Sequence, residues 1–202
     1  MEKGSLILRD NRWHHLAFVR QTNCYYFYYL YGVMKVAYKS MNAEKTERHV
    51  VLVCPEVHWN TGNAGRTCLG TDAFLHLIRP LGFSISDKHV RRAGLDYWSK
   101  VKLSVWDNFE AFREKMNPQA DEVFLFAKKG AKSFRSAIWA QRSFLIFGSE
   151  TQGLPDALVS KYKDAVYHIP VLQEIRSLNL STAVGIALYE SLRFSDPEHG
   201  WA

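Results

Sequence analysis

Cysteine is scarce in this sequence, and its few copies are not spaced as disulfide or metal-binding residues. Three cysteines, Cys24, Cys54 and Cys68, occur among 202 residues, each in an apolar neighbourhood. This pattern excludes the closely spaced pairs of small secreted domains and of zinc sites. We therefore expect reduced, buried thiols and an intracellular protein. The eight histidines also lack ligand spacing such as H-x3-H beside a carboxylate, so no metal centre is expected.

The sequence also lacks a hydrophobic run long enough to cross a membrane. Its aromatic stretch NCYYFYYLYGV, residues 23–33, is interrupted by tyrosine hydroxyls and is shorter than the roughly 20 apolar residues that a spanning helix needs. No small-residue cleavage site follows it cleanly, which argues against a secretory signal peptide. Acidic residues are few through position 43, so an organelle-targeting segment stays open beside an added surface element or a doubtful translation start.

A strongly basic main body is absent as well. The net charge is +6, but residues 1–48 hold 8 Lys and Arg against 4 Asp and Glu, whereas residues 49–202 hold 18 against 16. With 47% hydrophobic residues, the chain fits one globular domain at 49–202, preceded by an extension of unknown role at 1–48. Attraction to nucleic acid would have to come from local basic clusters. The candidates, which can also be solvated polar faces, are Lys88, Arg91 and Arg92, and Lys128, Lys129, Lys132 and Arg135.

From His49 onward, strand patterns alternate with helix patterns. Short β-branched or apolar runs predict strands at 50–54, 75–79, 101–105, 122–127, 143–148 and 165–170. Helices are predicted between and after them, at 62–73, 87–94, 107–116 with Asp107 as the N-cap, 155–162 with a proline in the first turn, and 179–193. The alternation predicts an α/β fold: a mostly parallel sheet with helices on both faces.

Ligands bind at the carboxyl ends of the strands in such sheets, so the loops after the strands are the candidate sites. The first loop, PEVHWNTGNAGRTC at 55–68, contains Asn60, Gly62 and Asn63, which favour a tight turn with left-handed backbone angles. Arg66 would then lie one turn into the following helix. An ordinary strand-to-helix turn with a surface arginine is an equal alternative.

The second loop, FGSETQGLP at 147–155, is rich in glycine but matches no nucleotide-binding motif. It lacks the G-x-G-x-x-G of dinucleotide sites and the G-K-[ST] of phosphate-binding loops. Gly148 and Gly153 instead allow the backbone to approach a flat ligand closely. We interpret Glu150, which lies between them, as a hydrogen-bond acceptor that fixes the loop rather than as a catalytic acid.

The third loop, IPVLQEIRSLNLS at 169–181, leads into the last predicted helix. Polar residues alternate with leucines over 176–181, so polar groups can point one way while the leucines anchor the loop in the core. N-capping of the helix by Asn179 or Ser177 explains part of this pattern. It does not explain Arg176 or the number of polar groups.

In this order, NTGNAGRTC, FGSETQGLP and IPVLQEIRSLNLS resemble the three signature motifs of the SpoU-type branch of the SPOUT methyltransferases. LHLIRPLGFSISDKHVRRAGLDYW, residues 75–98, is similar to a segment of its smallest members, the bacterial-type tRNA wobble-nucleotide 2′-O-methyltransferases. The resemblance covers about residues 50–194. It implies a C-terminal trefoil knot, S-adenosyl-L-methionine as cofactor, a homodimer, and 2′-O-methylation of the ribose at the wobble nucleotide of the tRNA anticodon stem-loop. No membrane or metal partner is implied.

The resemblance also implies roles for individual residues. Expected contacts to S-adenosylmethionine are Phe126, Gly148, Ile169, Ser177 and Leu178. Expected catalytic positions are Arg66, Asn60, Asn179 and Tyr189, and expected RNA-binding positions are Lys88, Arg91, Arg92 and Arg176. The apolar face of the helix at 179–193 and the helix of the first motif would supply the dimer surface.

Arg66 matches an arginine often given the role of general base in this family. A guanidinium whose pKa exceeds about 12 is a poor base at neutral pH. We therefore expect Arg66 to bind phosphate and orient the 2′-hydroxyl, with the proton passing to phosphate or water. The sequence departs from the family pattern at Trp59, where a small residue or proline is usual, and at Gly65, which weakens the helix beside Arg66.

The RNA is expected to be a single-stranded loop with a splayed base. Two alternatives stay open: a 2′-O-methyltransferase acting on another RNA such as rRNA, and an inactive RNA-binding paralogue. The lack of a separate RNA-binding domain argues against the first, and the intact motif residues argue against the second. The expected compartment is the cytoplasm, or a mitochondrion or plastid if residues 1–48 include a targeting segment.

Overall fold

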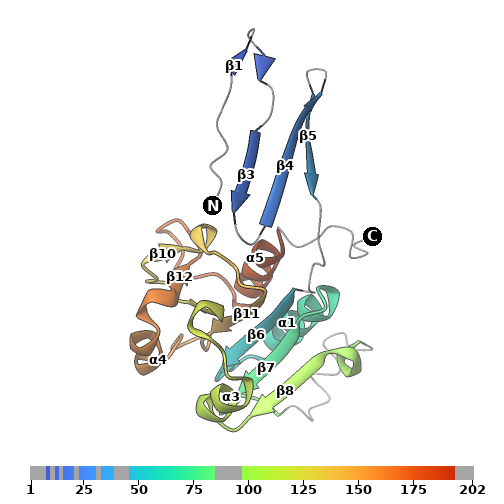
Figure 1. Cartoon of the computed structure of the whole chain (residues 1–202). Coiled ribbons are helices and arrows are strands. Elements are labelled where there is room, and N and C mark those ends of the chain that lie inside the picture. Colours follow the sequence, from blue (N-terminus) through green and yellow to red (C-terminus); the bar gives the residue numbers. More distant parts are fainter. Residues whose placement is uncertain are drawn as a thin grey trace. The chain divides into compact units, whose positions relative to one another are not determined.

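The computed structural model describes residues 46–84 and 97–193, together with five strands between residues 8 and 38 (Figure 1). The chain divides into two compact units, residues 1–44 and 45–202. The second unit contains all three loops that the sequence indicates as candidate sites.

The first unit contains two small antiparallel sheets. β1 (Leu8–Arg9) pairs with β2 (Arg12–Trp13), and β4 (Asn23–Leu30) lies between β3 (Leu16–Arg20) and β5 (Val33–Tyr38). The aromatic run is thus the central strand of a sheet, in keeping with the strand preference of Tyr and Phe. These strands were not predicted, because tyrosines at both odd and even positions of β4 hide the alternation that marks a half-buried strand.

The second unit is built on a seven-stranded sheet in which every strand pairing is parallel. The strand order is β10-β12-β9-β11-β6-β7-β8 (Figure 1). The strands are β6 (Glu47–Val53), β7 (Phe74–Ile78), β8 (Lys102–Trp106), β9 (Val123–Phe126), β10 (Lys132–Ser133), β11 (Arg142–Phe147) and β12 (Val166–His168). Six of them confirm the predicted strands. The edge strand β10 was not predicted, because two residues are too few to show a pattern.

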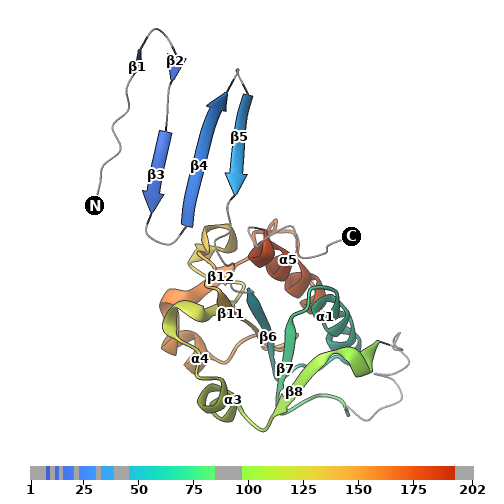
Figure 2. The same cartoon turned by 45° about the vertical axis from the view of Figure 1, so that its right-hand side comes forward.

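Helices cover both faces of this sheet (Figure 2). On one face, α1 (His58–Gly70) and α5 (Leu180–Leu192) share a core with Leu52 and its neighbours; on the other, α3 (Phe109–Met116) and α4 (Asp156–Lys161) share a core with Val51. The central strands are buried on both sides, which is why they read as continuous apolar runs. The predicted α/β architecture is therefore confirmed.

The structure also shows how α3, α4 and α5 begin. The Asn108 side chain caps α3 by accepting a hydrogen bond from the backbone N–H of Ala111 at 2.8 Å, so the prediction of Asp107 as the N-cap is wrong. Pro155 precedes α4 rather than lying in its first turn. Asn179 caps α5, as one of the two predicted alternatives required. The helix predicted at 87–94 lies outside the described residues.

Helix α1 begins four residues earlier than predicted. Asn60, Gly62 and Asn63 lie inside it, so the prediction of a left-handed turn at these residues is wrong. The left-handed backbone occurs instead at Cys54, where φ is 51° directly after β6. The chain changes direction there, and the helix therefore starts at His58. As a result Arg66 lies in the third turn of α1 rather than one turn into it.

The cysteines fit the prediction only in part. Cys68 is fully buried, and burial raises the pKa of its thiol to about 12. Cys54 is only half-buried, and burial raises the pKa of its thiol as well. Both are free thiols, while the side chain of Cys24 lies outside the description. Within 46–84 and 97–193, no helix has the length and apolarity that a membrane crossing requires.

A buried arginine fastens the end of α5 to the start of the sheet. Arg48 of β6 is 4% exposed, and its guanidinium donates to the carbonyl oxygens of Ser191 at 2.9 Å, Ala140 at 3.1 Å and Gln141 at 2.8 Å. Burial lowers its pKa to about 10. These bonds satisfy a charge that would otherwise be costly to bury, and they hold α5 against β6 and β11.

Two histidines are buried side by side in neighbouring strands. His49 Nδ1 of β6 lies 2.9 Å from His76 Nε2 of β7, and the Trp106 indole N–H donates to His76 Nδ1 at 3.1 Å. An indole can only donate, so this row of bonds assigns the proton of each ring to Nε2, and that of His49 points to Glu47 Oε1 at 3.1 Å. Burial lowers the pKa of His49 to about 4 and that of His76 to about 3, so both rings are neutral at pH 7.

Candidate active site

The three loops of the sequence motifs are joined by one row of side-chain hydrogen bonds. Glu150, after β11, accepts from Asn60 Nδ2 at 2.8 Å, and Asn60 Oδ1 accepts from Asn179 Nδ2 at 2.8 Å. Asn60 lies in the first turn of α1, and Asn179 caps α5. The bonded residues are 90 and 119 positions apart in the chain. The fold therefore brings together two of the expected catalytic residues, Asn60 and Asn179.

The chemistry of these side chains fixes the direction of each bond. A carboxylate can only accept, so the amide nitrogen of Asn60 faces Glu150 and its oxygen faces Asn179. Asn179 then presents its own oxygen to the start of α5, where it accepts from the backbone N–H of Ser181 at 2.9 Å. Asn60 is 8% exposed. Loss of either of its partners would leave a polar group without a hydrogen bond in a buried position.

Glu150 also ties the second loop to the first. Its carboxylate accepts from the backbone N–H of Glu56 at 2.8 Å and of Val57 at 3.3 Å. In return, the Glu56 carboxylate accepts from the Thr151 hydroxyl at 2.6 Å and from its backbone N–H at 3.2 Å. The interpretation of Glu150 as an acceptor that fixes the loop is confirmed. The reciprocal contribution of Glu56 and Thr151 was missed, since no short-range pattern connects residues 95 positions apart.

The second loop folds tightly on itself at its glycines. Ser149 and Gly153 exchange two backbone hydrogen bonds, of 3.1 and 3.0 Å, and Gly153 has a φ of 72°, which favours glycine. A Cβ atom on Gly148 would lie 1.9 Å from the carbonyl carbon of Gly153. Gly148 is thus required by the packing of the loop on itself, which is a different reason from the ligand approach that the sequence suggested.

Three of the expected cofactor contacts lie at the carboxyl ends of adjacent strands. Phe126 ends β9, Gly148 follows β11 and Ile169 follows β12, and β9 lies between the other two strands. The Phe126 ring stacks on that of Phe147, with centroids 4.7 Å apart. The remaining two expected contacts lie in the loop before α5, with Ser177 exposed and Leu178 half-buried.

Arg66 is an exposed residue of α1 whose guanidinium carbon lies 4.8 Å from the centre of the Tyr97 ring. The Tyr97 hydroxyl donates to the Gly62 carbonyl at 3.4 Å. Beside it, Gly65 lies under Trp98: a Cβ atom at Gly65 would be 2.5 Å from Trp98 Cζ3. α1 continues through Gly65. The contacts of Tyr97 and Trp98 with α1 were not predicted, although both residues belong to the segment 75–98 singled out from the sequence.

Tyr189 is not part of the hydrogen-bonded row. It lies ten residues after Asn179 in α5, which is about 15 Å along the helix axis. Its side chain is 57% exposed. Trp59 in the first turn of α1 is 48% exposed, so this departure from the family pattern adds apolar surface without disturbing the core.

Most of the expected RNA-binding residues lie outside the residues that the structure describes. Lys88, Arg91 and Arg92 fall in the undescribed segment 85–96, and Arg176 is exposed in the third loop. The second basic cluster is divided: Lys128 and Lys129 are exposed just after β9, at the same edge of the sheet as Phe126, whereas the Lys132 ammonium donates to the Asp164 carbonyl at 2.7 Å.

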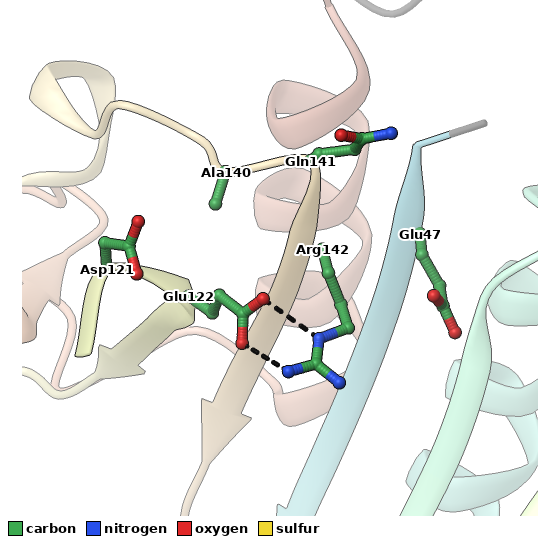
Figure 3. Close-up of a pocket in the computed structure, with 6 residues that line it drawn as sticks. All are labelled: Glu47, Asp121, Glu122, Ala140, Gln141 and Arg142. Carbon is green, nitrogen blue, oxygen red and sulfur yellow. Dashed lines mark hydrogen bonds and ion pairs between the residues drawn. The ribbon is translucent and has the colours of Figure 1, made fainter. Parts of the chain in front are cut away.

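A hollow of about 330 Å³ lies at the opposite ends of the strands (Figure 3). It is lined by Glu47, Asp121, Glu122, Ala140, Gln141 and Arg142, and its main feature is the ion pair in which Arg142 donates to Glu122 through two nitrogens, at 3.0 and 2.6 Å. None of the expected catalytic or cofactor residues lines it. It is therefore separate from the loops joined by Asn60.

The chain is similar to known proteins over most of its length. The model of the SpoU rRNA Methylase family matches residues 47–189, which include all three joined loops. The chain belongs to the SpoU methylase family. A protein of Listeria monocytogenes is 48% identical over 148 residues, with 72% of this chain and 86% of that protein covered. A Burkholderia cenocepacia protein named tRNA (cytidine(34)-2′-O)-methyltransferase is 39% identical over 153 residues, covering 75% of this chain and 98% of that protein.

Solved structures show the same SpoU methylase fold. One, described as giving structural insights into the 2-OH methylation of C/U34 on tRNA, superposes with a TM-score of 0.68 at 41% identity and covers 73% of this chain and 95% of that chain. An rRNA methyltransferase from Sinorhizobium meliloti, described with AdoMet bound, superposes with a TM-score of 0.67 at 24% identity, covering 74% of this chain and 57% of that chain. At that identity the second likeness shows the fold alone.

Proposed function

We propose that the protein transfers a methyl group from S-adenosyl-L-methionine to the ribose 2′-hydroxyl of the wobble nucleotide in a tRNA anticodon loop. The relatives named for this activity at cytidine 34 support the substrate. The observation that carries the proposal for this chain is the row Glu150, Asn60 and Asn179, because it assembles the three motif loops at one place. The testing experiment is methyl transfer to tRNA with C or U at position 34, read by nucleoside mass spectrometry.

The carboxyl ends of β9, β11 and β12 fit the cofactor. Main-chain groups at Gly148 and Ile169 would read the adenine edge, with Phe126 beside them and Ser177 and Leu178 contributing from the loop before α5. The tight turn at Gly148 and Gly153 fixes the backbone of the loop at this edge of the sheet. When bound, S-adenosylmethionine supplies a methyl group activated by its sulfonium. Calorimetry with S-adenosylmethionine tests this part, and an absence of binding would contradict the enzyme activity altogether.

Arg66 binds phosphate and orients the 2′-hydroxyl in this proposal. The guanidinium cannot serve as a base at neutral pH, so the proton passes to phosphate or water. Its planar fork suits two oxygens at once, whereas a lysine ammonium offers a single point charge. Arg66→Lys should therefore lower methyl transfer at least about tenfold while S-adenosylmethionine still binds. Near-full transfer by this variant would contradict the orienting role.

The chain after β12 carries the trefoil knot in this proposal, with the segment at 169–179 threaded through a loop before reaching α5. The chain crosses from β12, next to the edge strand β10, to α5. α5 packs on α1 and is held by Arg48, and this crossing supports the proposed knot. A knot is an exception to the usual rules of chain topology. Refolding after complete chemical unfolding should be slower than for an unknotted α/β domain of this size.

The protein acts as a homodimer through α1 and α5 in this proposal. Three apolar side chains of these helices are exposed: Trp59 at 48%, Ile186 at 38% and Tyr189 at 57%. A second copy covering this surface would bring Tyr189 of one copy toward the site of the other. Within one copy, Tyr189 lies about 15 Å along α5 from Asn179. Light scattering should give twice the chain mass, and Ile186→Glu should give a monomer.

Basic side chains hold the RNA backbone in this proposal. Arg176 and the turn with Lys128 and Lys129 lie on exposed loops of the second unit, and Lys88, Arg91 and Arg92 belong to the segment before Tyr97. Phosphate contacts release counterions, so raising salt should weaken tRNA binding steeply. Binding of S-adenosylmethionine should change little. Equal salt sensitivity of the two ligands would contradict the assignment.

A second candidate substrate is rRNA, which the family model names. The same assay separates the two: methylation of rRNA fragments with tRNA left unchanged would favour rRNA. Residues 1–48 are proposed as an extension to the methyltransferase domain at 49–202, and the place of action as the cytoplasm, or an organelle if the extension is a targeting segment. Imaging a C-terminal fluorescent fusion would distinguish these compartments.

A further inference from the structure

We propose that Tyr97 and Trp98 position Arg66 for the reaction. The inference rests on the proposed function, in which Arg66 orients the 2′-hydroxyl. It assigns a role to two aromatic residues that directly follow the segment holding Lys88, Arg91 and Arg92. Neither residue belongs to the three motif loops.

The first observation is that the Arg66 guanidinium lies over the Tyr97 ring. The guanidinium carbon lies 4.8 Å from the ring centre, within the range of a cation–π contact. The attraction comes from the negative face of the ring and holds the charged end of the side chain beside Tyr97. Tyr97 therefore restricts where the Arg66 guanidinium can lie.

The second observation is the way the aromatic pair is fixed on α1. The Tyr97 hydroxyl donates to the Gly62 carbonyl at 3.4 Å, one helical turn before Arg66. Trp98 lies directly over Gly65, where a Cβ atom would come within 2.5 Å of its ring. The absence of a side chain at Gly65 thus leaves room for the Trp98 ring beside Arg66. Both rings are half-buried against the core shared by α1 and α5.

The consequence is a pre-oriented arginine. A free arginine side chain is among the most flexible, and ordering it at the moment of reaction costs conformational entropy. A side chain already held against a ring loses less when the RNA binds, and a catalytic group must be held in its productive geometry to be effective. The side chains of Tyr97 and Trp98 act through Arg66 and do not themselves need to touch the reacting atoms.

The first test compares Tyr97→Phe with Tyr97→Leu. Phe keeps the ring and loses only the hydrogen bond to Gly62, so its kcat should stay within about threefold of the parent chain. Leu removes the ring, so kcat should fall about 3- to 30-fold. The Kd for S-adenosylmethionine and the unfolding midpoint should differ little between the two variants. Equal kcat values for both would overturn the proposal.

The second test uses Gly65. Gly65→Ala should lower kcat, because the new Cβ atom pushes Trp98 away, although alanine by itself favours a helix. Adding Trp98→Leu removes the ring that collides, and the double variant should lose no more activity than Trp98→Leu alone. Gly70→Ala is the matched control in the same helix, where a Cβ atom meets nothing within 4 Å, and it should keep its activity. Equal kcat for Gly65→Ala and Gly70→Ala would overturn the role of Trp98.

A third comparison separates this inference from the proposed function. Arg66→Ala should abolish most methyl transfer, and adding Tyr97→Leu to it should lower kcat no further, because the two residues act as a unit. If Arg66→Ala is fully active while S-adenosylmethionine binds, the proposed role of Arg66 fails. If Arg66→Ala is inactive but Tyr97→Leu is fully active, only the positioning role of Tyr97 fails.

Discussion

Asn179 donates a hydrogen bond from Nδ2 to Asn60 Oδ1 at 2.8 Å, linking the cap of α5 to the first turn of α1 across 119 positions of the chain. Each asparagine makes a second interaction: Asn60 donates a hydrogen bond to Glu150, and Asn179 caps α5. The two bonds of Asn60 therefore join the starts of two helices and fix the loop after β11. Folding of this domain and assembly of its candidate site depend on one another here.

Replacing Asn60 by leucine tests this dependence. The variant leaves Asn179 Nδ2 without its partner in a partly buried place, and Glu150 Oε1 keeps only the 3.3 Å bond from the Val57 N–H. The free energy of unfolding should therefore fall by about 1–3 kcal/mol. Urea unfolding followed by fluorescence measures the change. Asn63→Ala, at an exposed position of the same helix, is the control and should stay within about 0.5 kcal/mol of the parent chain. Equal stability of the two variants would contradict the structural role of Asn60.

Gly148→Ala should disrupt the second loop. The added Cβ atom would meet the Gly153 and Leu154 backbones at 1.9 and 2.1 Å, and backbone atoms cannot move aside as a flexible side chain can. Binding of S-adenosylmethionine, measured by calorimetry, should weaken at least about tenfold, which corresponds to about 1.4 kcal/mol. Gly185→Ala is the control, since a Cβ atom there meets nothing within 4 Å. Undiminished binding by Gly148→Ala would show that this turn does not shape the cofactor site.

Stability should fall as the pH drops below about 6.5, because of His49 and His76. Burial lowers the pKa of His49 to about 4 and that of His76 to about 3. In the unfolded chain, both histidines have the ordinary pKa of about 6.5. The unfolded state therefore binds more protons below pH 6.5, and stability is lost from there down to about pH 3–4, by up to about 1.4 kcal/mol per pH unit for each histidine. Above pH 6.5 this contribution is fully present.

Urea unfolding at pH 7.5, 6.5 and 5.5 measures that slope. His49→Phe is the informative variant, because His49 already stacks between Phe74 and Phe144, with ring centroids 4.8 and 4.5 Å away. The variant should flatten the dependence on pH whatever its absolute stability. An identical slope in the variant and the parent chain would assign the acid sensitivity to other groups.

Arg48→Met should be among the more destabilising substitutions in the sheet. It removes the guanidinium that donates to the carbonyls of Ser191, Ala140 and Gln141. The Ala140 and Gln141 carbonyls keep bonds from the Ser143 hydroxyl and the Glu47 N–H, so the main loss falls on the carbonyl of Ser191, a buried residue, and should be about 2 kcal/mol in the free energy of unfolding. Arg113→Met, which removes a solvent-exposed ion pair with Glu110, should cost less than about 1 kcal/mol. Similar losses for the two would mean that Arg48 does not fasten α5.

The sequence predicted the second unit better than the first, because strands that are buried on both faces appear in the sequence as continuous apolar runs. Continuous apolar runs such as β6 and β11 can be recognised without their neighbours, and so can the capped start of α5. The start of α1 was misplaced because Asn60, Gly62 and Asn63 have the composition of a turn. The true change of direction falls on Cys54, a residue type that gives no signal for a positive φ.

The contacts that build the candidate site could not be derived from one sequence. The motifs indicated which loops matter, but the bond from Asn60 to Asn179 spans most of the second unit and follows no local spacing. The collision that requires glycine at 148 is made by the loop itself, and the one at 65 by Trp98. Tertiary packing decides both, which is why the glycines could be noted but not explained.

Nucleoside mass spectrometry shows whether this chain methylates the wobble ribose. The purified chain is incubated with S-adenosylmethionine and a tRNA that carries C or U at position 34, and the digested anticodon loop is then analysed. We expect one added 2′-O-methyl group at nucleotide 34, lost in Arg66→Ala although that variant still binds S-adenosylmethionine. A tRNA left unmodified by the chain with S-adenosylmethionine bound, or methylated at another nucleotide, would contradict the proposed function.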